Sequence, residues 1–300
     1  MKSGKFKIVL AAVLLGAGLL SGGCGSSAGS SAGTSASSAV SQQTAEAKPT
    51  ELPKDPNVPR GQAAVHREPG VKYSVPEGVS VLMYHMIGND KNNAAVMTAE
   101  NLKWQMKYLK DNGYHPITMQ ELHDYVTKGA PLPEKPVCIT FDDGYEDNYT
   151  IVYPLMKQYG FPWTFFVIMG QVGQANRVTW DQLKEMADSQ AVTIANHTMT
   201  HPKLHNLPRE EARAEIEGAQ KALKDNLGID NHWMAYPYGD YDEEVDKMAK
   251  AAGIDIAVTT DSGRVHVGSY PYELKRVWIG NEVSRSQFAE RLSKDDYTII

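Results

Sequence analysis

The apolar run Val137–Phe141 leads directly into two adjacent carboxylates, Asp142 and Asp143, which are followed by Gly144. Two like charges at the end of a buried strand are costly to remove from water. Gly144 permits backbone angles that other residues avoid, so the chain can turn sharply and present both carboxylates. Paired carboxylates can divide labour, one binding a metal and the other acting as a base. The alternative is a strand-terminal Asp that caps the next helix.

Two histidines four residues apart, His197 and His201, follow the apolar run Val192–Asn196. Neutral imidazoles at this spacing can bind one divalent cation. Thr198 and Pro202 disfavour a helix here, so the pair is predicted on a loop and not on a metalloprotease-type helix. One Asp and two His leave coordination positions open for water and substrate, as catalytic metal sites require. Zinc suits this ligand set, and cobalt, nickel and iron also bind it.

The segments that carry these residues alternate between strand and helix. Short apolar runs predict strands, and the longer amphipathic stretches between them predict helices. The predicted strands cover residues 79–85, 137–141, 163–168, 192–196, 232–236, 256–260 and 274–280. The predicted helices cover residues 98–113, 119–129, a segment that ends at 160, 179–188, 208–228 and 242–253. This alternation is typical of a parallel sheet with helical crossovers.

A closed (β/α) barrel and a doubly wound open sheet both fit this alternation. The barrel is favoured because nearly every unusual polar residue follows a different predicted strand. These residues are His85, Asp142, Asp143, His197, Tyr238, Asp261 and Arg276. The strand ends of a barrel converge on one mouth, whereas an open sheet gathers residues from only two or three strands at its switch point.

The composition is ordinary for a soluble α/β protein, with 42% hydrophobic and 22% charged residues. The formal net charge of −6 argues against nucleic acid or an anionic membrane surface as the main partner. The sequence contains no glycine-rich phosphate loop and no basic stripe. Cys138 lies inside an apolar run and is predicted to be a core residue, so no disulfide framework is expected.

The first 23 residues are typical of a signal peptide, with Lys2, Lys5 and Lys7 before an apolar run over residues 8–20. Small residues then precede Cys24, which resembles the lipidated cysteine of bacterial lipoproteins, although the leucine lies one place further away than usual. We therefore expect a location outside the cytoplasm, on the cell membrane through lipidated Cys24, or secretion with Cys24 as a spare thiol. Residues 24–70 predict a flexible tether, and residues 71–300 a folded domain.

Two motifs together carry a family resemblance. TFDDGY at residues 140–145 and HTMTH at residues 197–201 resemble the first two signature motifs of the polysaccharide deacetylase (NodB-homology) family of carbohydrate esterases. The resemblance runs from about residue 79 to residue 279. It implies an α/β fold, a distorted (β/α) barrel of about seven parallel strands. VLMYHMI at residues 81–87 and AYPYG at residues 235–239 are most similar to the subgroup that deacetylates poly-β-1,6-N-acetylglucosamine.

The resemblance also implies roles for the motif residues. Asp142 would be the catalytic base, while Asp143, His197 and His201 would hold the metal. The metal would polarise an acetamide carbonyl and lower the pKa of a bound water. The backbone N–H of Tyr238 would then stabilise the oxyanion, as it does by family analogy. The implied substrate is a polysaccharide, and the implied enzyme is an N-deacetylase.

Two positions depart from the family pattern. The arginine that usually opens the third motif is replaced by Ala235, and Arg276 either supplies that charge or forms a surface ion pair. The late Leu-x-His acid motif is missing after Leu274. The general acid is therefore His85, His266 or the recycled base. Alternatives to the deacetylation of poly-N-acetylglucosamine are action on peptidoglycan or chitooligosaccharides, a catalytically weak carbohydrate-binding protein, and a purely structural surface protein.

Overall fold

The computed structural model describes residues 53–90 and 92–297 of the chain. The predicted signal peptide, the predicted lipidation site Cys24 and the first part of the predicted tether lie outside these described residues. Among the described residues, no helix has both the length and the apolar character needed to cross a bilayer.

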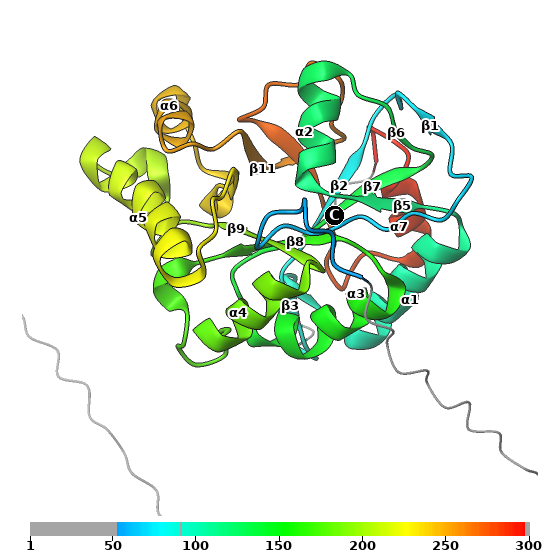
Figure 1. The fold of residues 1–300 in the computed structure, drawn as a ribbon, viewed down its shortest axis with the longest axis horizontal. Coiled ribbons are helices and arrows are strands. Elements are labelled where there is room, and N and C mark those ends of the chain that lie inside the picture. The colour runs from blue at the N-terminus through cyan, green and yellow to red at the C-terminus, as the bar shows by residue number, and fades with distance from the viewer. Residues whose placement is uncertain (1–52, 91, 298–300) are drawn as a thin grey trace, which may run out of the picture. The chain divides into compact units, whose positions relative to one another are not determined.

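Parallel strands close into a barrel in the order β2-β12-β11-β10-β9-β8-β7, and β7 pairs with β2 to complete the ring. Their bounds are β2 (Ser80–Tyr84), β7 (Pro136–Phe141), β8 (Trp163–Val167), β9 (Val192–Asn196), β10 (Trp233–Ala235), β11 (Ile256–Ser262) and β12 (Leu274–Trp278). Each strand corresponds to one of the predicted apolar runs. The predicted barrel of about seven parallel strands is therefore confirmed (Figure 1).

An additional strand distorts the ring between β7 and β8. Strand β5 (His115–Ile117) pairs with the first half of β7, where His115 lies opposite Pro136. Strand β8 pairs with the last part of β7, where Thr140 lies opposite Thr164. Short strands also form two small sheets outside the barrel: β1 (Tyr73–Ser74) with β6 (Leu132–Pro133), and β3 (Met86–Ile87) with β4 (Val96–Met97).

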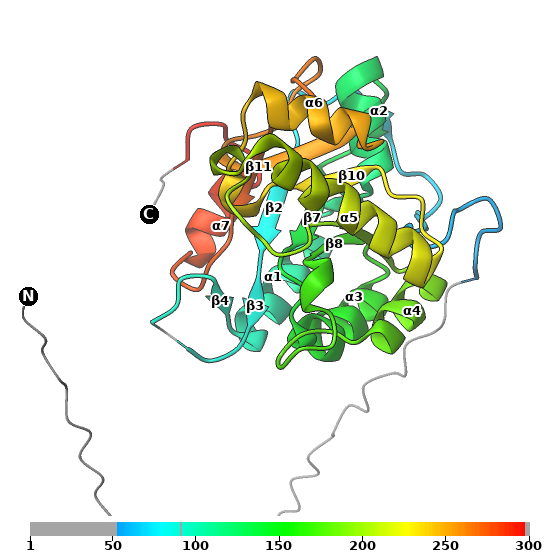
Figure 2. The ribbon, with the colours of Figure 1, turned by 90° about the vertical axis from the view of Figure 1, so that its left-hand side faces the viewer.

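The helices lie around the strands, and α5 and α6 face the viewer in Figure 2. Their bounds are α1 (Ala99–Asp111), α2 (Met119–Lys128), α3 (Tyr153–Tyr159), α4 (Trp180–Ser189), α5 (Arg209–Leu227), α6 (Glu243–Ala251) and α7 (Arg285–Arg291). A π-helical turn, η1 (Asn148–Val152), precedes α3, and short 3₁₀ turns form η2 (Met169–Gln171), η3 (Leu204–Asn206) and η4 (Pro237–Gly239). The sequence predicted six of these α-helices but not α7.

Local signals explain where the predicted helices begin. The Thr98 side chain accepts a hydrogen bond from the N–H of Asn101 and caps α1. Thr118 and Glu121 form a reciprocal capping box at the start of α2. These side chains satisfy backbone N–H groups that have no partner inside the helix.

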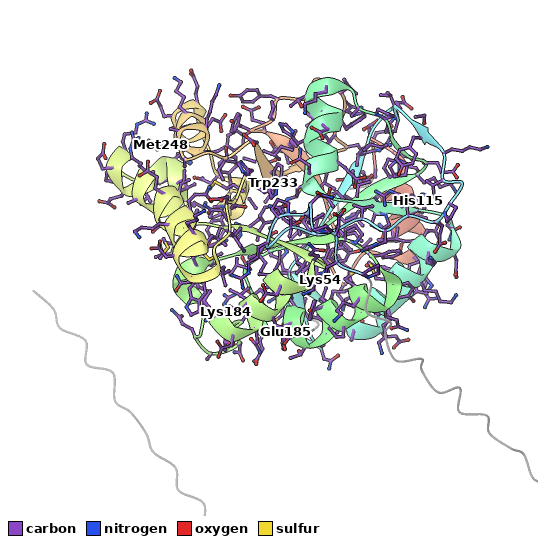
Figure 3. The ribbon with its side chains drawn as sticks, in the orientation of Figure 1. Lys54, His115, Lys184, Glu185, Trp233 and Met248 are labelled. Atoms are coloured by element: carbon purple, nitrogen blue, oxygen red, sulfur yellow. The ribbon has the colours of Figure 1, made fainter. Side chains whose placement is uncertain are left out.

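Side chains alternate between the inside and the outside of the barrel along each strand. On β7, Val137 and Ile139 pack outward beneath the helices, while Cys138 belongs to a separate apolar cluster inside the ring. Cys138 is fully buried, as the sequence predicted, and its Sγ lies 3.8 Å from Sδ of Met119 on α2. Helix α2 therefore covers the end of the barrel at which the strands begin. Trp233 and His115, labelled in Figure 3, are the first residues of β10 and β5.

Part of the segment predicted as a flexible tether also lies on the folded chain. The N–H of Gly61 donates to the carbonyl of Ala187 at 3.1 Å, and the N–H of Ala63 donates to Oγ1 of Thr193 at 3.0 Å. Ala63 and Ala64 are buried. The predicted tether boundary at residue 70 is therefore too late. This segment is held by backbone hydrogen bonds and by two buried alanines. Neither feature produces the apolar sequence pattern by which packed segments are recognised.

Candidate metal centre and catalytic site

The two carboxylates lie on a strained turn at the end of β7. Asp143 has φ 75° and Gly144 has φ 77°, so both adopt the left-handed conformation that side chains disfavour. A Cβ at Gly144 would lie 2.9 Å from Cγ1 of Val167, so this position also requires glycine for space. The turn directs Asp142 into the barrel mouth, where its side chain is 2% exposed.

A second segment holds this turn. The Nη1 of Arg177 donates to the carbonyl of Asp143 at 2.9 Å, and the N–H of Val178 donates to the carbonyl of Gly144 at 3.0 Å. The Arg177 guanidinium lies 4.0 Å from the ring centroid of Tyr145, within the range of cation–π attraction. These contacts stabilise backbone angles that the turn would not keep alone.

The two histidines stand on the loop that follows β9. Thr198 (φ 64°) and His201 (φ 66°) are left-handed, and Oγ1 of Thr198 accepts from the N–H of His201 at 3.1 Å. Nδ1 of His197 lies 2.7 Å from the carbonyl of Ala235. A carbonyl can only accept, so Nδ1 carries the proton and the lone pair of a neutral ring is on Nε2.

Asp143, His197 and His201 meet at one point, with ligand atoms that lie within 4.8 Å of one another. Oδ1 of Asp143 lies 3.4 Å from Nε2 of His197 and 3.4 Å from Nε2 of His201. That oxygen is buried and has no hydrogen-bond partner among the residues that the structure describes. Two ligands about 2.1 Å from a tetrahedral ion are separated by about 3.4 Å, so the three residues fit a divalent metal.

The charge states of two of these groups suit metal ligation. Burial opposes ionisation of Asp143, but the nearby histidines outweigh it and hold its pKa well below the usual range. Burial and the neighbouring His197 lower the pKa of His201 to about 4, so its ring is neutral at pH 7. Burial also disfavours the charged form of His197, but the carboxylates of Asp143 and Asp142 raise its pKa. A bound cation would reverse that influence.

Asp142 forms a buried ion pair with Arg276. Nη1 of Arg276 donates to Oδ1 at 2.8 Å and Nη2 donates to Oδ2 at 2.7 Å. Arg276 stands in the middle of β12 and not at its end, and its side chain is 0% exposed. Its other donors reach the carbonyl of Thr259 and Oγ1 of Thr140. The surface ion pair that the sequence left open for Arg276 is therefore excluded.

This pairing determines the protonation state of Asp142. Burial alone would raise the pKa of its carboxyl group, but the Arg276 guanidinium outweighs burial and lowers it. Asp142 is therefore ionised at neutral pH and can accept a proton.

His85 directly follows β2 and lies close to Asp142. Its Nε2 lies 3.9 Å from Oδ2 of Asp142, and its ring lies 5.2 Å from that of Trp278. Its carbonyl accepts from Nδ2 of Asn148 at 3.0 Å. Burial lowers the pKa of His85. Nδ1 of His85 is buried, and no group in the described part of the chain forms a hydrogen bond with it.

His266, another candidate acid, lies elsewhere. Its Nδ1 is 2.7 Å from the carbonyl of Glu77, which precedes β2, and its Nε2 is 3.0 Å from Oδ1 of Asp295. His266 therefore lies at the end of the barrel where β2 begins, opposite the carboxylates, and this prediction is wrong.

Tyr238 brings another strained residue to the mouth. It has φ 60° within η4, and the ring centroids of Tyr238 and His201 are 4.5 Å apart. Oγ1 of Thr260 donates to its carbonyl at 3.2 Å. Its side chain is 59% exposed, which leaves an aromatic face open beside His201.

Sequence reasoning missed several residues that position this site, including Arg177, Asn148 and Trp278. None belongs to a motif. Arg177 and Asn148 reach a site residue through hydrogen bonds and Trp278 through a ring contact, in each case between distant segments. The arrangement as a whole joins a metal-ligand trio, an ionised carboxylate and an imidazole at one barrel mouth. This combination can activate water and transfer protons, as hydrolysis of an acyl bond requires.

Comparison with known proteins agrees with this arrangement. The polysaccharide deacetylase family matches residues 129–257. YxkH of Bacillus subtilis, whose name places it among the polysaccharide deacetylases, is 34% identical over 218 residues, which cover 73% of this chain and 77% of YxkH. The poly-β-1,6-N-acetyl-D-glucosamine N-deacetylase of Escherichia coli is 24% identical over 72% of this chain, which spans only 38% of that enzyme.

A solved structure shows the same fold. The Streptococcus pyogenes deacetylase PplD, solved in complex with acetate, superimposes with a TM-score of 0.69 at 26% identity. The match covers 73% of this chain and the whole of PplD. The identity with YxkH and the fold shared with PplD lead to one conclusion: the chain belongs to the polysaccharide deacetylase family.

Proposed function

We propose that this deacetylase is a metal-dependent hydrolase that removes N-acetyl groups from a β-linked N-acetylglucosamine polysaccharide outside the cell. One observation carries the proposal: within residues 53–90 and 92–297, a buried carboxylate oxygen of Asp143 has no hydrogen-bond partner and faces two imidazole nitrogens, with the ionised Asp142 beside them. A buried carboxylate oxygen without a hydrogen-bond partner is costly, and a bound cation would offset that cost.

Asp143, His197 and His201 would hold the metal, with zinc the best match to one carboxylate and two imidazoles. When bound, the ion polarises the acetamide carbonyl and lowers the pKa of water. The hydrogen bond from His197 to the Ala235 carbonyl fixes the orientation of one ligand ring before any ion arrives.

Proton transfer is assigned to Asp142 and His85. As water adds to the carbonyl carbon, Asp142 accepts its proton, which the ion pair with Arg276 permits because it keeps the carboxylate ionised. The carbon–nitrogen bond then breaks, and the departing amine takes the proton that Asp142 accepted, either directly from Asp142 recycled as an acid or relayed through His85, whose Nε2 lies 3.9 Å from Oδ2 of Asp142. The backbone N–H of Tyr238 would donate to the oxyanion. The products are acetate and a free amine.

The proposed substrate is poly-β-1,6-N-acetylglucosamine, because the E. coli relative carries that name and the segments at residues 81–87 and 235–239 resemble its subgroup. Deacetylation would convert a neutral polymer into a cationic one, which would bind anionic cell surfaces. The predicted signal peptide and Cys24 support a location on the outer side of the cell membrane through a lipid anchor.

The test is acetate release from a panel of β-1,4 and β-1,6 N-acetylglucosamine oligomers, with metal analysis of the same protein sample. We expect release that stops with a chelator and returns with zinc. Asp142→Asn should lower kcat by about 10²–10⁴-fold while metal content stays unchanged. Preference for β-1,4 oligomers would move the assignment to chitin or peptidoglycan. Bound metal without acetate release from any oligomer would mean a binding protein.

A further inference from the structure

The loop that carries His197 and His201 has no regular secondary structure, yet each of its N–H groups is used. The N–H of His197 donates to the carbonyl of Val167 at 3.1 Å, and that of Thr198 donates to Oδ1 of Asn196 at 2.7 Å. The N–H of His201 donates to Oγ1 of Thr198. Two N–H groups in the middle of the loop, those of residues 199 and 200, require an acceptor from elsewhere.

One carboxylate from α5 supplies that acceptor. Oε2 of Glu215 accepts from the N–H of Met199 at 2.9 Å and from the N–H of Thr200 at 2.7 Å. Its Oε1 accepts from Oγ1 of Thr200 at 2.6 Å. These are charge-assisted hydrogen bonds, which are stronger than those between neutral groups. Glu215 thus spans the part of the loop between the two histidines.

A second feature of α5 brings the helix close to the same loop. Gly218 follows Glu215 by three residues and lies on the same helical face. A Cβ at Gly218 would lie 2.9 Å from Cγ of Met199, so only glycine lets the helix approach this closely. Glycine weakens the interior of a helix, which makes its presence in α5 informative.

The other side of Met199 is also constrained. Its carbonyl accepts from the N–H of Gly170 at 2.8 Å, and a Cβ at Gly170 would lie 2.5 Å from that oxygen. The loop is therefore held between η2 and α5. Thr198 and His201 can keep their left-handed angles because neighbours on both sides determine the path of the backbone.

We infer that Glu215 is a positioning residue of the metal centre, which holds the loop so that His201 meets Asp143 and His197 before a metal binds. The inference rests on the proposed metal-binding function. Without Glu215, two N–H groups and a hydroxyl lose their acceptor, and the loop that leads into the left-handed His201 keeps only the hydrogen bond from the His201 N–H to Oγ1 of Thr198 and the contact of Met199 with Gly170. The imidazole then has to be ordered when the metal binds, so affinity falls.

The experiment compares three variants of the full chain by calorimetric zinc titration of metal-free protein. Glu215→Ala should weaken zinc binding by about 10–100-fold, the usual effect of removing a group that orients a ligand. Glu215→Gln should stay within about threefold of the parent protein, because one amide oxygen can accept both N–H groups and the NH₂ can donate to Thr200. Glu217→Ala is the matched control, since Glu217 is exposed on the same helix and pairs only weakly with Arg213.

The unfolding midpoint of each metal-free variant separates positioning from folding. We expect similar midpoints for Glu215→Ala and Glu217→Ala, with different zinc affinities. Gly218→Ala provides a second variant that leaves Glu215 intact: it favours the helix but displaces Met199, and it should also weaken zinc binding.

If the parent protein and Glu215→Ala bind zinc with the same affinity, this inference is wrong and the proposed function still stands. Glu215→Gln that binds as weakly as Glu215→Ala also overturns it, because the hydrogen bonds would not be the cause. Parent protein that takes up no metal overturns the proposed function, and this inference with it.

Discussion

Arg276 and Asp142 are separated by 134 residues in the sequence and form a two-point ion pair inside the barrel. The guanidinium comes from the middle of β12, and Ala235 stands where the family pattern has its arginine. At this position the backbone carbonyl of Ala235 accepts a hydrogen bond from Nδ1 of His197 and orients its ring. The charge beside the base is thus supplied from another strand, through the barrel interior.

Removing this guanidinium should affect both stability and catalysis. Arg276→Met leaves the Asp142 carboxylate buried and unpaired, which should lower the free energy of unfolding by about 3–5 kcal/mol. The double variant Asp142→Asn with Arg276→Met should recover much of this loss but none of the activity. Urea unfolding measures the first effect and acetate release the second. Arg209→Met, at an exposed arginine on α5, is the control. If Arg276→Met is as stable as the parent protein, the buried ion pair between Arg276 and Asp142 is contradicted.

His85 can be tested as the general acid by its effect on turnover. His85→Gln should lower kcat by about 10²–10⁴-fold, because the departing amine loses its proton donor, while KM and metal content change little. His266→Gln is a matched control at the opposite end of the barrel and should retain full activity. Equal kcat values for the parent protein and His85→Gln would assign the proton to Asp142 instead.

Arg177 should prove necessary for the carboxylate turn. Arg177→Ala removes the hydrogen bond to the Asp143 carbonyl and the contact with the Tyr145 ring. We expect metal affinity to fall by about tenfold, because the ligand is no longer held in its strained position. Zinc titration measures this change, with Arg213→Ala on α5 as the control. If both arginine variants bind zinc equally well, the turn holds its shape without Arg177.

Asp246 should make stability depend on pH. Burial raises the pKa of Asp246 to about 6, while the hydroxyl of Tyr236 donates to its Oδ1 at 2.9 Å. The folded state therefore binds this proton more tightly than the unfolded state, so stability falls as pH rises from about 4 to about 6.

Asp246→Asn should remove this penalty and keep an acceptor for Tyr236. We expect a gain of about 1 kcal/mol at pH 7.5, less than the shift alone would imply because repulsion from nearby acidic residues is screened. The unfolding midpoint should rise by about 2–4 °C at pH 7.5 and by nothing at pH 4. A gain that is equal at both pH values would show that ionisation of Asp246 is not its source.

Sequence reasoning predicted the barrel well because its strands are buried on both sides. Such strands read as continuous apolar runs, and each of the seven runs corresponds to an observed strand. It missed β5 because three residues with Pro116 in the middle carry no strand pattern, and pairing with β7 alone defines them. It placed the tether boundary too late because Ala63 and Ala64 are small and their segment is held by backbone hydrogen bonds.

The amino-acid sequence by itself determined which strands form the barrel and which polar residues follow them, because periodicity and turn-forming glycines act over a few neighbouring residues. That information was sufficient to group Asp142, Asp143, His197 and His201 at one mouth. Only the tertiary structure decided that Arg276 pairs with Asp142, that His266 lies at the far end and that Glu215 spans the histidine loop. Closure of the barrel brings Arg276 to Asp142 across 134 residues of sequence, and the packing of α5 against the loop brings Glu215 to Met199. Neither arrangement can be inferred from neighbouring residues in the sequence.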